Sequence, residues 1–287
     1  MPSFQHILFP VDFSQQNRGI AAHVVCMARR YKAQVTMLNV VEMPARAYPG
    51  FEYAPAIDLP AVVEKRQQCL DSYLKDELQD LWTGRVVFDG DPAARITEYA
   101  EQENVDLIML PTHGYGPFRR FLLGSVTAKL LHDVKCAIWT SAHLPEPPAL
   151  PTGYRKVLCA VDLSAKSLPL LQWTSEFARE QGATVKLVHA VPAAKTTSGL
   201  ELEGDRFRAS LFDWSRENLA KLQGQAGTAF ETVVKGGDVV HVIAEAAGAA
   251  HADLVVIGRG VMQHVLGRMR THVYSIVRES PCPVISI

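Results

Sequence analysis

The stretch ILFPVDFS at residues 7–14 recurs as VLCAVDLS at residues 157–164, an offset of 150 residues. In both copies a short apolar run is followed by Asp, one residue and Ser, which is typical of a buried strand that leads into a helix. Two further pairs of stretches follow in the same order: VTMLNVV (35–41) with VKLVHAV (185–191), and VDLIML (105–110) with ADLVVI (252–257). Because the order is kept throughout, the sequence predicts two tandem copies of one unit.

The length of the chain agrees with two domains. It has 287 residues, 48% of them apolar, whereas a single domain commonly has roughly 100 to 150 residues. Between the copies, prolines at positions 145, 147, 148 and 151 remove backbone donors and disfavour both helix and sheet. We therefore predict a first domain at 1–143, a proline-rich linker at 144–154 and a second domain at 155–287.

Each copy alternates short apolar runs with longer amphipathic segments, which indicates βαβ units and a parallel sheet buried on both faces. The predicted fold class is α/β, with two tandem, doubly wound, Rossmann-like sheets of five parallel strands and the first strand central. The expected strands are HILFPV, QVTMLNV, RVVF, VDLIML and CAIWT in the first copy, and KVLCAV, TVKLVHAV, ETVVK, ADLVVIG and CPVISI in the second. The last strand of each copy should lie at a sheet edge.

Polar residues mark the expected helix starts. Ser14 and Ser164 occupy N-cap positions, and Asp91 followed by proline is a typical helix start because the first turn does not need the missing N–H. Ser125 and Thr271 hold the same kind of position before the last helix of each copy.

Charge and cysteine content exclude several classes of protein. The net charge of −1, from 29 basic and 30 acidic residues, provides no overall field for nucleic acid or an anionic membrane. No apolar run approaches the roughly 20 residues of a membrane span, and the N-terminus shows no cationic leader. The five cysteines form no CxxC pair, as expected for reduced thiols. These features predict a soluble cytoplasmic protein.

The residues after the first and fourth predicted strands should frame a ligand site. If the fourth strand ends near Leu110, THGYG follows it, and the segment to Ser125 returns the chain to the last helix. Ligands of doubly wound sheets bind beyond the carboxyl ends of the strands, where the winding reverses. Glycines that let backbone N–H groups approach an anion, together with a helix N-terminus, suit a phosphate chain. The residues expected there are Val11, Asp12, Gly114, Gly124, Ser125 and Thr127.

The combination of VDFS after strand one, THG after strand four, nine residues and then GSV resembles the universal stress protein (UspA) family, and the C-terminal RESPCPVISI is also typical of it. The resemblance spans nearly the whole chain in tandem form, and it implies an adenine nucleotide alpha hydrolase-like fold that binds ATP, with or without Mg²⁺. It further implies that Asp12 contacts the adenosine, that the backbone near Val40 meets adenine, and that Gly114, Gly124, Ser125 and Thr127 hold phosphates. The full predicted binding set is Pro10, Val11, Asp12, Val40, Leu110, His113, Gly114, Gly124, Ser125, Val126 and Thr127 in the first half, and Ala160, Val161, Asp162, Ala190, Gly258, Gly260 and Thr271 in the second.

Both halves depart from the family pattern. Pro111 replaces the leading glycine of the first half and removes one N–H donor, worth about 1.5–3 kcal/mol if its bond were charge-assisted. In the second half Arg270 replaces the glycine before Thr271, which costs roughly 1–2 kcal/mol if the position requires a left-handed backbone. Arg259, Arg268 and Arg270 offer side chains to phosphate instead. We expect the first half to be the better nucleotide site.

Structural interpretations stand beside the functional ones. Asp12 and Asp162 either contact ligand or orient the loops that cap the next helices, and Gly114 and Gly124 are alternatively plain turn glycines. The chain contains no GxxxxGK[ST] loop and no GxGxxG after the first strand, so ATP turnover is at most slow and a dehydrogenase is disfavoured.

Two functions remain open at this point. One is a regulatory nucleotide-binding protein, and the other is an interaction module that uses the aromatic segment 44–60 to bind a protein partner. Family members commonly pair their edge strands between subunits, so the resemblance also implies that the two halves pack as an intramolecular pseudo-dimer. A homodimer is a further option.

Overall fold

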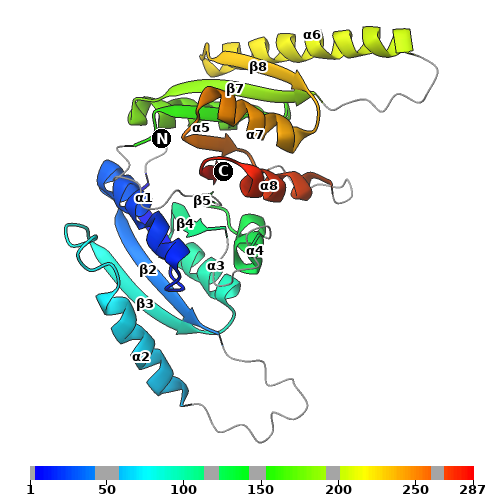
Figure 1. Ribbon diagram of the computed structural model, residues 1–287. Coiled ribbons are helices and arrows are strands. Elements are labelled where there is room, and N and C mark those ends of the chain that lie inside the picture. Colours follow the sequence, from blue (N-terminus) through cyan, green and yellow to red (C-terminus); the bar gives the residue numbers. More distant parts are fainter. Residues whose placement is uncertain (1–3, 43–57, 113–122, 142–152, 192–200, 260–267) are drawn as a thin grey trace, which may run out of the picture. The chain divides into compact units, whose positions relative to one another are not determined.

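The computed structural model describes residues 4–42, 58–112, 123–141, 153–191, 201–259 and 268–287 (Figure 1). In helices α6 and α8, the side chains of residues 201–206, 208 and 268–271 lie outside this description. The described residues form two compact units. One contains residues 4–138, and the other contains residues 139–141 and 153–287.

The first half is a doubly wound parallel sheet with β1 in its centre. Its strand order is β3-β2-β1-β4-β5, and the pairs of β1 with β2, β1 with β4 and β2 with β3 are all parallel. The predicted fold class and the central position of the first strand are therefore confirmed. In chain order the elements are β1 (His6–Pro10), α1 (Gln15–Tyr31), β2 (Gln34–Val41), α2 (Leu59–Ser72), β3 (Thr83–Asp89), α3 (Pro92–Gln102), β4 (Leu107–Pro111), α4 (Ser125–Asp133) and β5 (Ala137–Ser141).

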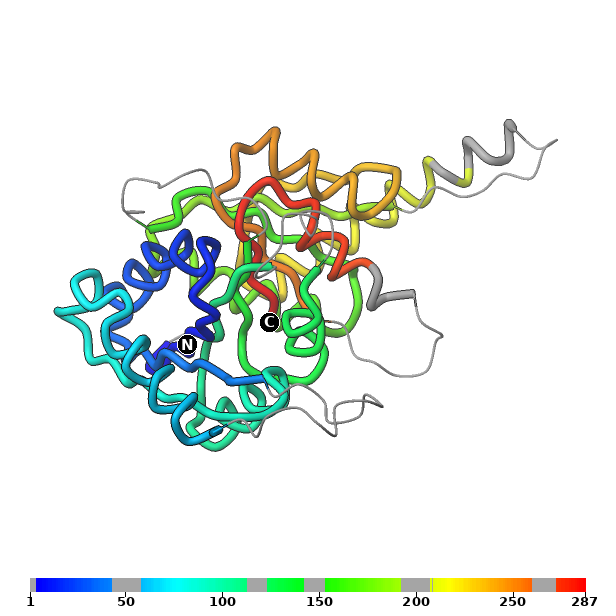
Figure 2. The backbone as a smooth tube through the Cα atoms, turned by 60° about the horizontal axis from the view of Figure 1, so that its bottom comes forward, coloured from blue at the N-terminus to red at the C-terminus, as the bar shows by residue number. Residues whose placement is uncertain are grey.

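The second half repeats this topology, because its strand order β8-β7-β6-β9-β10 reads as the same 3-2-1-4-5 sequence. The most visible difference is α6, which Figures 1 and 2 show as a long helix that reaches beyond the strands of its own half. The elements are β6 (Lys156–Ala160), α5 (Ser167–Gln181), β7 (Thr184–Val191), α6 (Glu201–Ala226), β8 (Glu231–Gly236), α7 (Val239–Ala250), β9 (Leu254–Ile257), α8 (Arg268–Glu279) and β10 (Val284–Ser286).

The centre of each sheet is buried on both faces, as the continuous apolar runs predict. Every residue of β1 and every residue of β9 is buried. An acidic residue just before the fourth strand of each half holds the start of the first strand. The Asp106 carboxylate accepts from the backbone N–H groups of Gln5 and His6 at 2.8 and 2.9 Å, and Asp253 accepts from Arg155 and Lys156 at 2.7 and 3.1 Å. Both halves therefore fix their two central strands in the same way.

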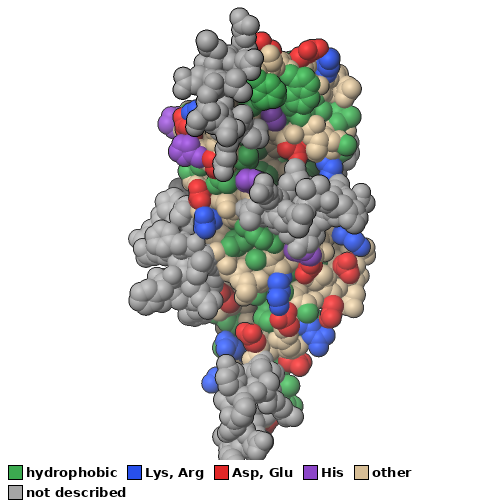
Figure 3. Space-filling model, turned by 90° about the vertical axis from the view of Figure 1, so that its right-hand side faces the viewer, with side chains coloured by type: hydrophobic (Ala, Val, Ile, Leu, Met, Phe, Trp, Pro, Cys, Tyr) green, Lys and Arg blue, Asp and Glu red, His purple; other side chains and the backbone are tan. Residues whose placement is uncertain are grey.

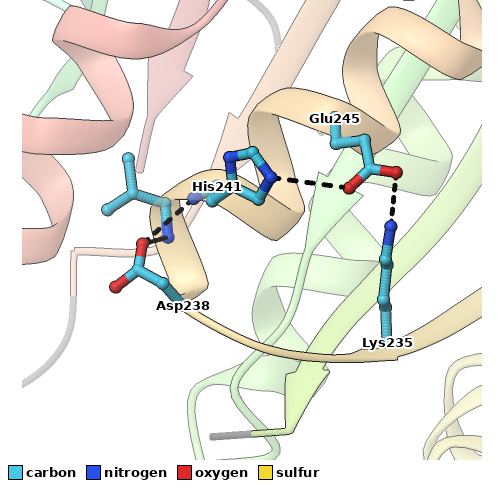
Figure 4. A network of polar contacts seen from close by, with 5 residues as sticks. Lys235, Asp238, His241 and Glu245 are labelled. Atoms are coloured by element: carbon cyan, nitrogen blue, oxygen red, sulfur yellow. Dashed lines mark hydrogen bonds and ion pairs between the residues drawn. The ribbon is translucent and has the colours of Figure 1, made fainter. Parts of the chain in front are cut away.

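Several helix starts agree with the sequence. Ser14 accepts from the Asn17 N–H at the start of α1, and Asp91 accepts from the Ala94 N–H at the start of α3. In the second half Asp238 caps α7 by accepting from Val240 and His241. Figure 4 shows this cap beside a solvent-exposed network in which Glu245 contacts both Lys235 and His241.

Three other helix starts correct the prediction. The N-cap of α4 is Gly124, so Ser125 is its first helical residue. The N-cap of α5 is Lys166, because Ser164 caps the preceding turn by accepting from the Lys166 N–H. Helix α8 begins at Arg268, which places Thr271 inside its first turn.

The described surface carries mixed charge. On the face drawn in Figure 3, basic and acidic side chains are interspersed, in keeping with the net charge of −1. None of the five cysteines, all of which lie in the described ranges, forms a disulfide. Within the described parts of the chain, no helix has the length and apolar character needed to cross a bilayer.

Candidate functional site

The candidate site of the first half lies where the loops after β1 and β4 meet. These strands are neighbours in the sheet, yet β1 continues through α1 to one side of it and β4 continues through α4 to the other. The carboxyl ends of two adjacent parallel strands therefore diverge here, which is the geometry that opens a crevice in a doubly wound sheet.

The loop after β1 is held by a short network around Asn17. The Asn17 side chain is buried; its Oδ1 accepts from the Asp12 N–H at 2.6 Å and its Nδ2 donates to the Pro10 carbonyl at 3.0 Å. Asp12 itself is exposed, and its Oδ1 accepts from the Ser14 N–H at 2.9 Å. The carboxylate thus orients the loop, as the structural interpretation predicts. A contact with adenosine stays a prediction.

Phe13 gives this loop an unusual backbone. Its φ of 61° places a bulky residue in the left-handed region, and Leu163 repeats this with a φ of 59° at the equivalent position of the second half. The Phe13 ring is packed edge-on against Tyr73 at 5.3 Å, and the Arg66 guanidinium lies 5.6 Å from its centre. Strained backbones of this kind persist where surrounding contacts enforce them and are concentrated at functional sites.

A polar side chain from β2 closes the base of the site. The buried Asn39 Nδ2 donates to the Val11 carbonyl at 2.7 Å, while Val11 also donates its N–H to the Leu38 carbonyl at 2.8 Å. The Asn39 Oδ1 is buried and has no hydrogen-bond partner among the residues that the structure describes. The neighbouring Val40, predicted to meet adenine through its backbone, is half-buried at the same carboxyl end.

Helix α4 begins directly against the end of β4. The Gly124 N–H donates to the Thr112 carbonyl at 2.8 Å, and the buried Thr127 hydroxyl donates to the Pro111 carbonyl at 3.2 Å. The Thr127 hydroxyl therefore joins α4 to β4, and its predicted contact with phosphate remains untested. These two bonds bring the first turn of the helix to the mouth of the crevice.

The start of α4 differs from the other helix starts of the first half. Helices α1, α2 and α3 each begin with a side chain that accepts from a first-turn N–H, from Ser14, Asp58 and Asp91 respectively. Gly124 offers no such acceptor. The first-turn amides of α4, those of Ser125, Val126 and Thr127, thus lack a capping side chain from the N-cap. Such amides and the helix dipole attract an anion.

The conformation of Gly124 corrects one argument from the sequence. Its φ of −60° and ψ of 143° are an extended backbone that any residue adopts. In the second half α8 begins at Arg268, so Arg270 lies within the right-handed helix and the left-handed penalty does not apply there. The role of Gly124 is to supply an N-cap without a side chain.

The second half builds its first loop differently around Asp162. The Asp162 Oδ1 accepts from the Ser164 N–H at 2.9 Å and from the buried Ser167 hydroxyl at 3.0 Å. Burial disfavours the charged carboxylate, but these hydrogen bonds outweigh it and hold the pKa of Asp162 below its ordinary value. His189 takes the place of Asn39, with its Nδ1 at 2.8 Å from the Val161 carbonyl. Ala160 and Ala190, at the ends of β6 and β7, are half-buried.

The loop after β9 meets the start of α5 at the corresponding corner of the second half. The Lys166 ammonium donates to the Arg259 carbonyl at 3.5 Å, and Arg259 donates its own N–H to the Ile287 carbonyl at 2.7 Å. At Gly258 an added Cβ would meet Leu170 at 3.5 Å, an ordinary contact. The glycine is therefore not required there by local packing.

Some predicted residues lie outside the described parts of the chain. They are His113, Gly114 and Gly260, the side chain of Thr271, and residues 44–57 of the aromatic segment 44–60. The structure thus brings together Pro10, Val11, Asp12, Val40, Leu110, Gly124, Ser125, Val126 and Thr127 at the carboxyl edge of the first sheet, and it collects Ala160, Val161, Asp162, Ala190 and Gly258 at the same edge of the second.

Sequence reasoning missed two sets of residues that shape these loops. Asn17 and Ser167 hold equivalent positions in the first turn region of α1 and α5, and both bind the preceding aspartate loop through buried side chains. Asn39 and His189 likewise bind the carbonyl after the first strand. The available signal for Asn39 and His189 was a polar residue at the same position of each copy near the carboxyl end of the second strand.

Comparison with known proteins agrees with the repeated architecture. The model of the universal stress protein family matches residues 3–140 and 153–287. A universal stress protein of Methanocaldococcus jannaschii is 27% identical over 148 residues, which cover 47% of this chain and 80% of the relative. A universal stress protein of Synechocystis is 28% identical over 136 residues, with 47% of this chain and 83% of the relative covered.

Solved structures resemble the chain over its full length. A universal stress protein from Archaeoglobus fulgidus has a TM-score of 0.68 at 17% identity, covering 98% of this chain and 97% of that protein. A chain described as a putative universal stress protein from Pseudomonas aeruginosa has a TM-score of 0.66 at 16% identity, covering 100% and 94%. At these identities the likeness establishes the fold.

Proposed function

Because this chain belongs to the universal stress protein family in tandem form, we propose that it binds ATP or a related adenine nucleotide in a regulatory capacity, and that the first half is the better site. The family supplies the ligand class. The geometry of the crevice between β1 and β4 supplies the reason to favour the first half.

The observation that carries this proposal is the bare N-cap of α4. Helices α1 to α3 use a side chain to satisfy a first-turn amide, whereas α4 presents its amides at the crevice behind a glycine. A phosphate group satisfies such amides and is favoured by the helix dipole. In this proposal Gly124 has no capping side chain because a phosphate group of the ligand accepts from the first-turn amides of α4 instead.

In this proposal the other site residues each contact a different part of the nucleotide. The backbone beside Val40 takes the adenine edge, and the exposed Asp12 carboxylate accepts from a ribose hydroxyl. The Asn17 side chain holds the backbone at Asp12 and Pro10, and the Ser14 N–H donates to the Asp12 carboxylate, so the loop is ordered before ligand arrives. A loop that is already ordered loses less conformational entropy on binding.

The second half has a different donor set. Lys166 and Arg259 lie near its corner, where the first half has Gln16 and Thr112, and Asp162 already accepts two hydrogen bonds. We infer that this half binds adenine nucleotide less well. Its anion contacts come from side chains, which are less preorganised than helix amides.

The test is isothermal titration of the native protein with ATP, with and without Mg²⁺, compared with Gly124→Asp. The extended backbone at Gly124 accommodates aspartate, which is a good N-cap and a competitor for phosphate. We expect Gly124→Asp to keep or slightly raise the melting temperature and to weaken ATP binding at least about tenfold, or about 1.4 kcal/mol. Weaker ATP binding by Gly124→Asp at an unchanged melting temperature would show that the substitution affects ligand binding and not folding.

Gly124→Asn is the matched control, because it caps the helix without adding charge. It should weaken ATP binding less than Gly124→Asp does. Equal ATP affinity in the native protein and in Gly124→Asp would remove the helix terminus from the site. An absence of heat and of thermal shift in the native protein would favour the alternative, an interaction module that acts through protein partners.

Location and assembly form the rest of the proposal. None of the five cysteines is in a disulfide, which fits a reducing compartment and supports assignment to the cytoplasm. Within each half the last strand stands at one end of the strand order, which supports pairing of the two edges as an intramolecular pseudo-dimer. Homodimerisation and a protein partner belong to the same proposal.

A further inference from the structure

A cavity of about 560 Å³ lies at the edge of the first sheet opposite the candidate nucleotide site. Gln5, Gln34 and Trp82 stand at the starts of β1, β2 and β3, and these strands are parallel, so the cavity is at their amino ends. The candidate nucleotide site is at the carboxyl ends. The volume lies within the roughly 300–1,000 Å³ of small-molecule sites. The last turn of α1 and the segment before β3 complete the lining: Ala28, Arg29, Lys32, Ala33, Asp80 and Leu81.

Trp82 gives this cavity an exposed aromatic wall. It is 68% exposed, the highest value among the large apolar side chains of the described residues. Its backbone is nevertheless fixed, because the Trp82 carbonyl accepts from the Val35 N–H at 3.0 Å and Thr83 pairs with Val35 in the sheet. An indole ring on a fixed backbone is a stacking surface for a planar ligand at low entropic cost.

Three charged side chains line the cavity, and their net charge is +1 because Arg29 and Asp80 neutralise each other while Lys32 is positively charged. Arg29 and Asp80 form a two-pronged ion pair, with Nε–Oδ2 and Nη2–Oδ1 distances of 2.9 Å each. The Asp80 hydrogen bond raises the pKa of Arg29 and the Arg29 hydrogen bond lowers the pKa of Asp80, so this pair remains ionised and neutral overall. The Lys32 ammonium has no carboxylate within ion-pair distance among the described residues.

The fold accounts for Arg29 but not for the other two groups. Arg29 lies in the last turn of α1, where a cation complements the helix dipole, and it is neutralised by Asp80. Lys32 follows the helix in a left-handed conformation, with φ of 53°, and its backbone N–H completes the cap. Among the described residues, the Lys32 ammonium forms no ion pair and the Trp82 ring forms no contact with another aromatic ring.

We propose that this cavity binds a small planar aromatic anion, stacked on Trp82 with its carboxylate, sulfonate or phosphate group at Lys32. The amides of Gln5 and Gln34 supply further polar contacts at the same edge. A neutral aromatic ligand gains only the stacking contact, and an aliphatic anion gains only the charge contact. This site is independent of the nucleotide proposed for the carboxyl edge.

The experiment uses the full chain and two probes with the same ring, 2-naphthoate and 2-naphthalenemethanol. Calorimetry should show that native protein binds the naphthoate more tightly than the neutral alcohol. Trp82→Ala should weaken naphthoate at least about tenfold, in line with aromatic stacking energies. Lys32→Gln should weaken naphthoate about twofold to fivefold, as expected for an exposed charge pair. It should also make the two probes nearly equal.

A spectroscopic measurement locates the probe. Of the four tryptophan indole N–H signals, the one lost in Trp82→Ala should shift on titration with naphthoate. Trp214→Ala is the matched control, because Trp214 is 55% exposed on α6; this variant and Gly124→Asp should bind naphthoate as the native protein does. Equal naphthoate affinity in Trp82→Ala and native protein, or shifts confined to the other three indoles, would overturn the proposal.

Discussion

At the scale of single residues, position and burial decide what a polar side chain does. Asn39 in β2 and His189 in β7 hold equivalent positions, and each binds the carbonyl that follows the first strand of its half. His23, on the buried face of α1, is a different case. Burial lowers its pKa to about 4, so the folded protein keeps this imidazole neutral well below its ordinary value.

The first prediction concerns the stability that depends on His23. A histidine whose pKa is lower in the folded state contributes fully above its unfolded value, about 6.5, and less as the pH falls from there toward about 4. Over that window the free energy of unfolding should fall by about 3 kcal/mol because of His23 alone. Urea titrations at several pH values should show a flatter profile for His23→Gln. Parallel profiles in the two proteins would contradict the assignment.

At the scale of elements, helix termini distinguish structural ends from the candidate binding end. Asp91 caps α3 through the Ala94 N–H and also contacts the Lys129 ammonium of α4 at 3.1 Å. These contacts hold the pKa of Asp91 below its ordinary value. Gly124, at the start of that same α4, has no capping side chain. The start of α3 thus has a capping side chain from the protein, and the start of α4 has none at its N-cap.

The second prediction separates these two contacts of Asp91. Asp91→Ala should reduce the free energy of unfolding near neutral pH by about 1 kcal/mol, because the cap is lost, whereas Asp91→Asn should lose less because asparagine also caps. Since the folded pKa of Asp91 is depressed, its charge-dependent contribution is present above about pH 3.9 and is lost as the pH falls below it. Denaturation at about pH 7 and about pH 3 should therefore show a smaller difference between native protein and Asp91→Asn at the acidic value.

Lys129→Gln completes this comparison. It removes the ion pair and keeps the Asp91 cap, so its loss of stability should resemble that of Asp91→Asn. A loss as large as that of Asp91→Ala would show that the cap contributes little.

At the scale of the whole molecule, the two copies share one fold but differ in the residues at the carboxyl ends of their strands. In the first copy α4 begins with amides that no N-cap side chain covers, whereas in the second copy the Lys166 ammonium donates to the Arg259 carbonyl after β9. The Asp162 carboxylate of the second copy already accepts two hydrogen bonds. Duplication keeps the sheet because its strands are held by packing. The loops at the carboxyl ends are under weaker constraint and have diverged.

The third prediction is that nucleotide affects one copy more than the other. Hydrogen exchange measured by mass spectrometry with and without ATP should show new protection at residues 11–17 and 124–128. The equivalent residues 161–167 and 271–275 should change less at the same ATP concentration. A ligand that binds only the folded form stabilises the unit that holds it. Equal protection of both copies would show that Lys166 and Arg259 replace the helix amides fully.

The sequence by itself determined the two tandem α/β units, the strand positions, the central place of the first strand and the caps at Ser14 and Asp91. Each of these depends on local periodicity or on residues close together in the chain. Only the tertiary structure decided that Gly124 is the N-cap with an extended backbone, that Ser164 caps a turn, that Asn39 and His189 bind the loop after the first strand, and that Trp82 and Lys32 share a cavity. The Ser164 cap is a local contact with Lys166 that its sequence pattern did not distinguish from a helix cap. The contacts of Asn39 and His189 and the cavity of Trp82 and Lys32 join residues far apart in the chain. Such contacts arise from strand register and packing, which no local pattern records.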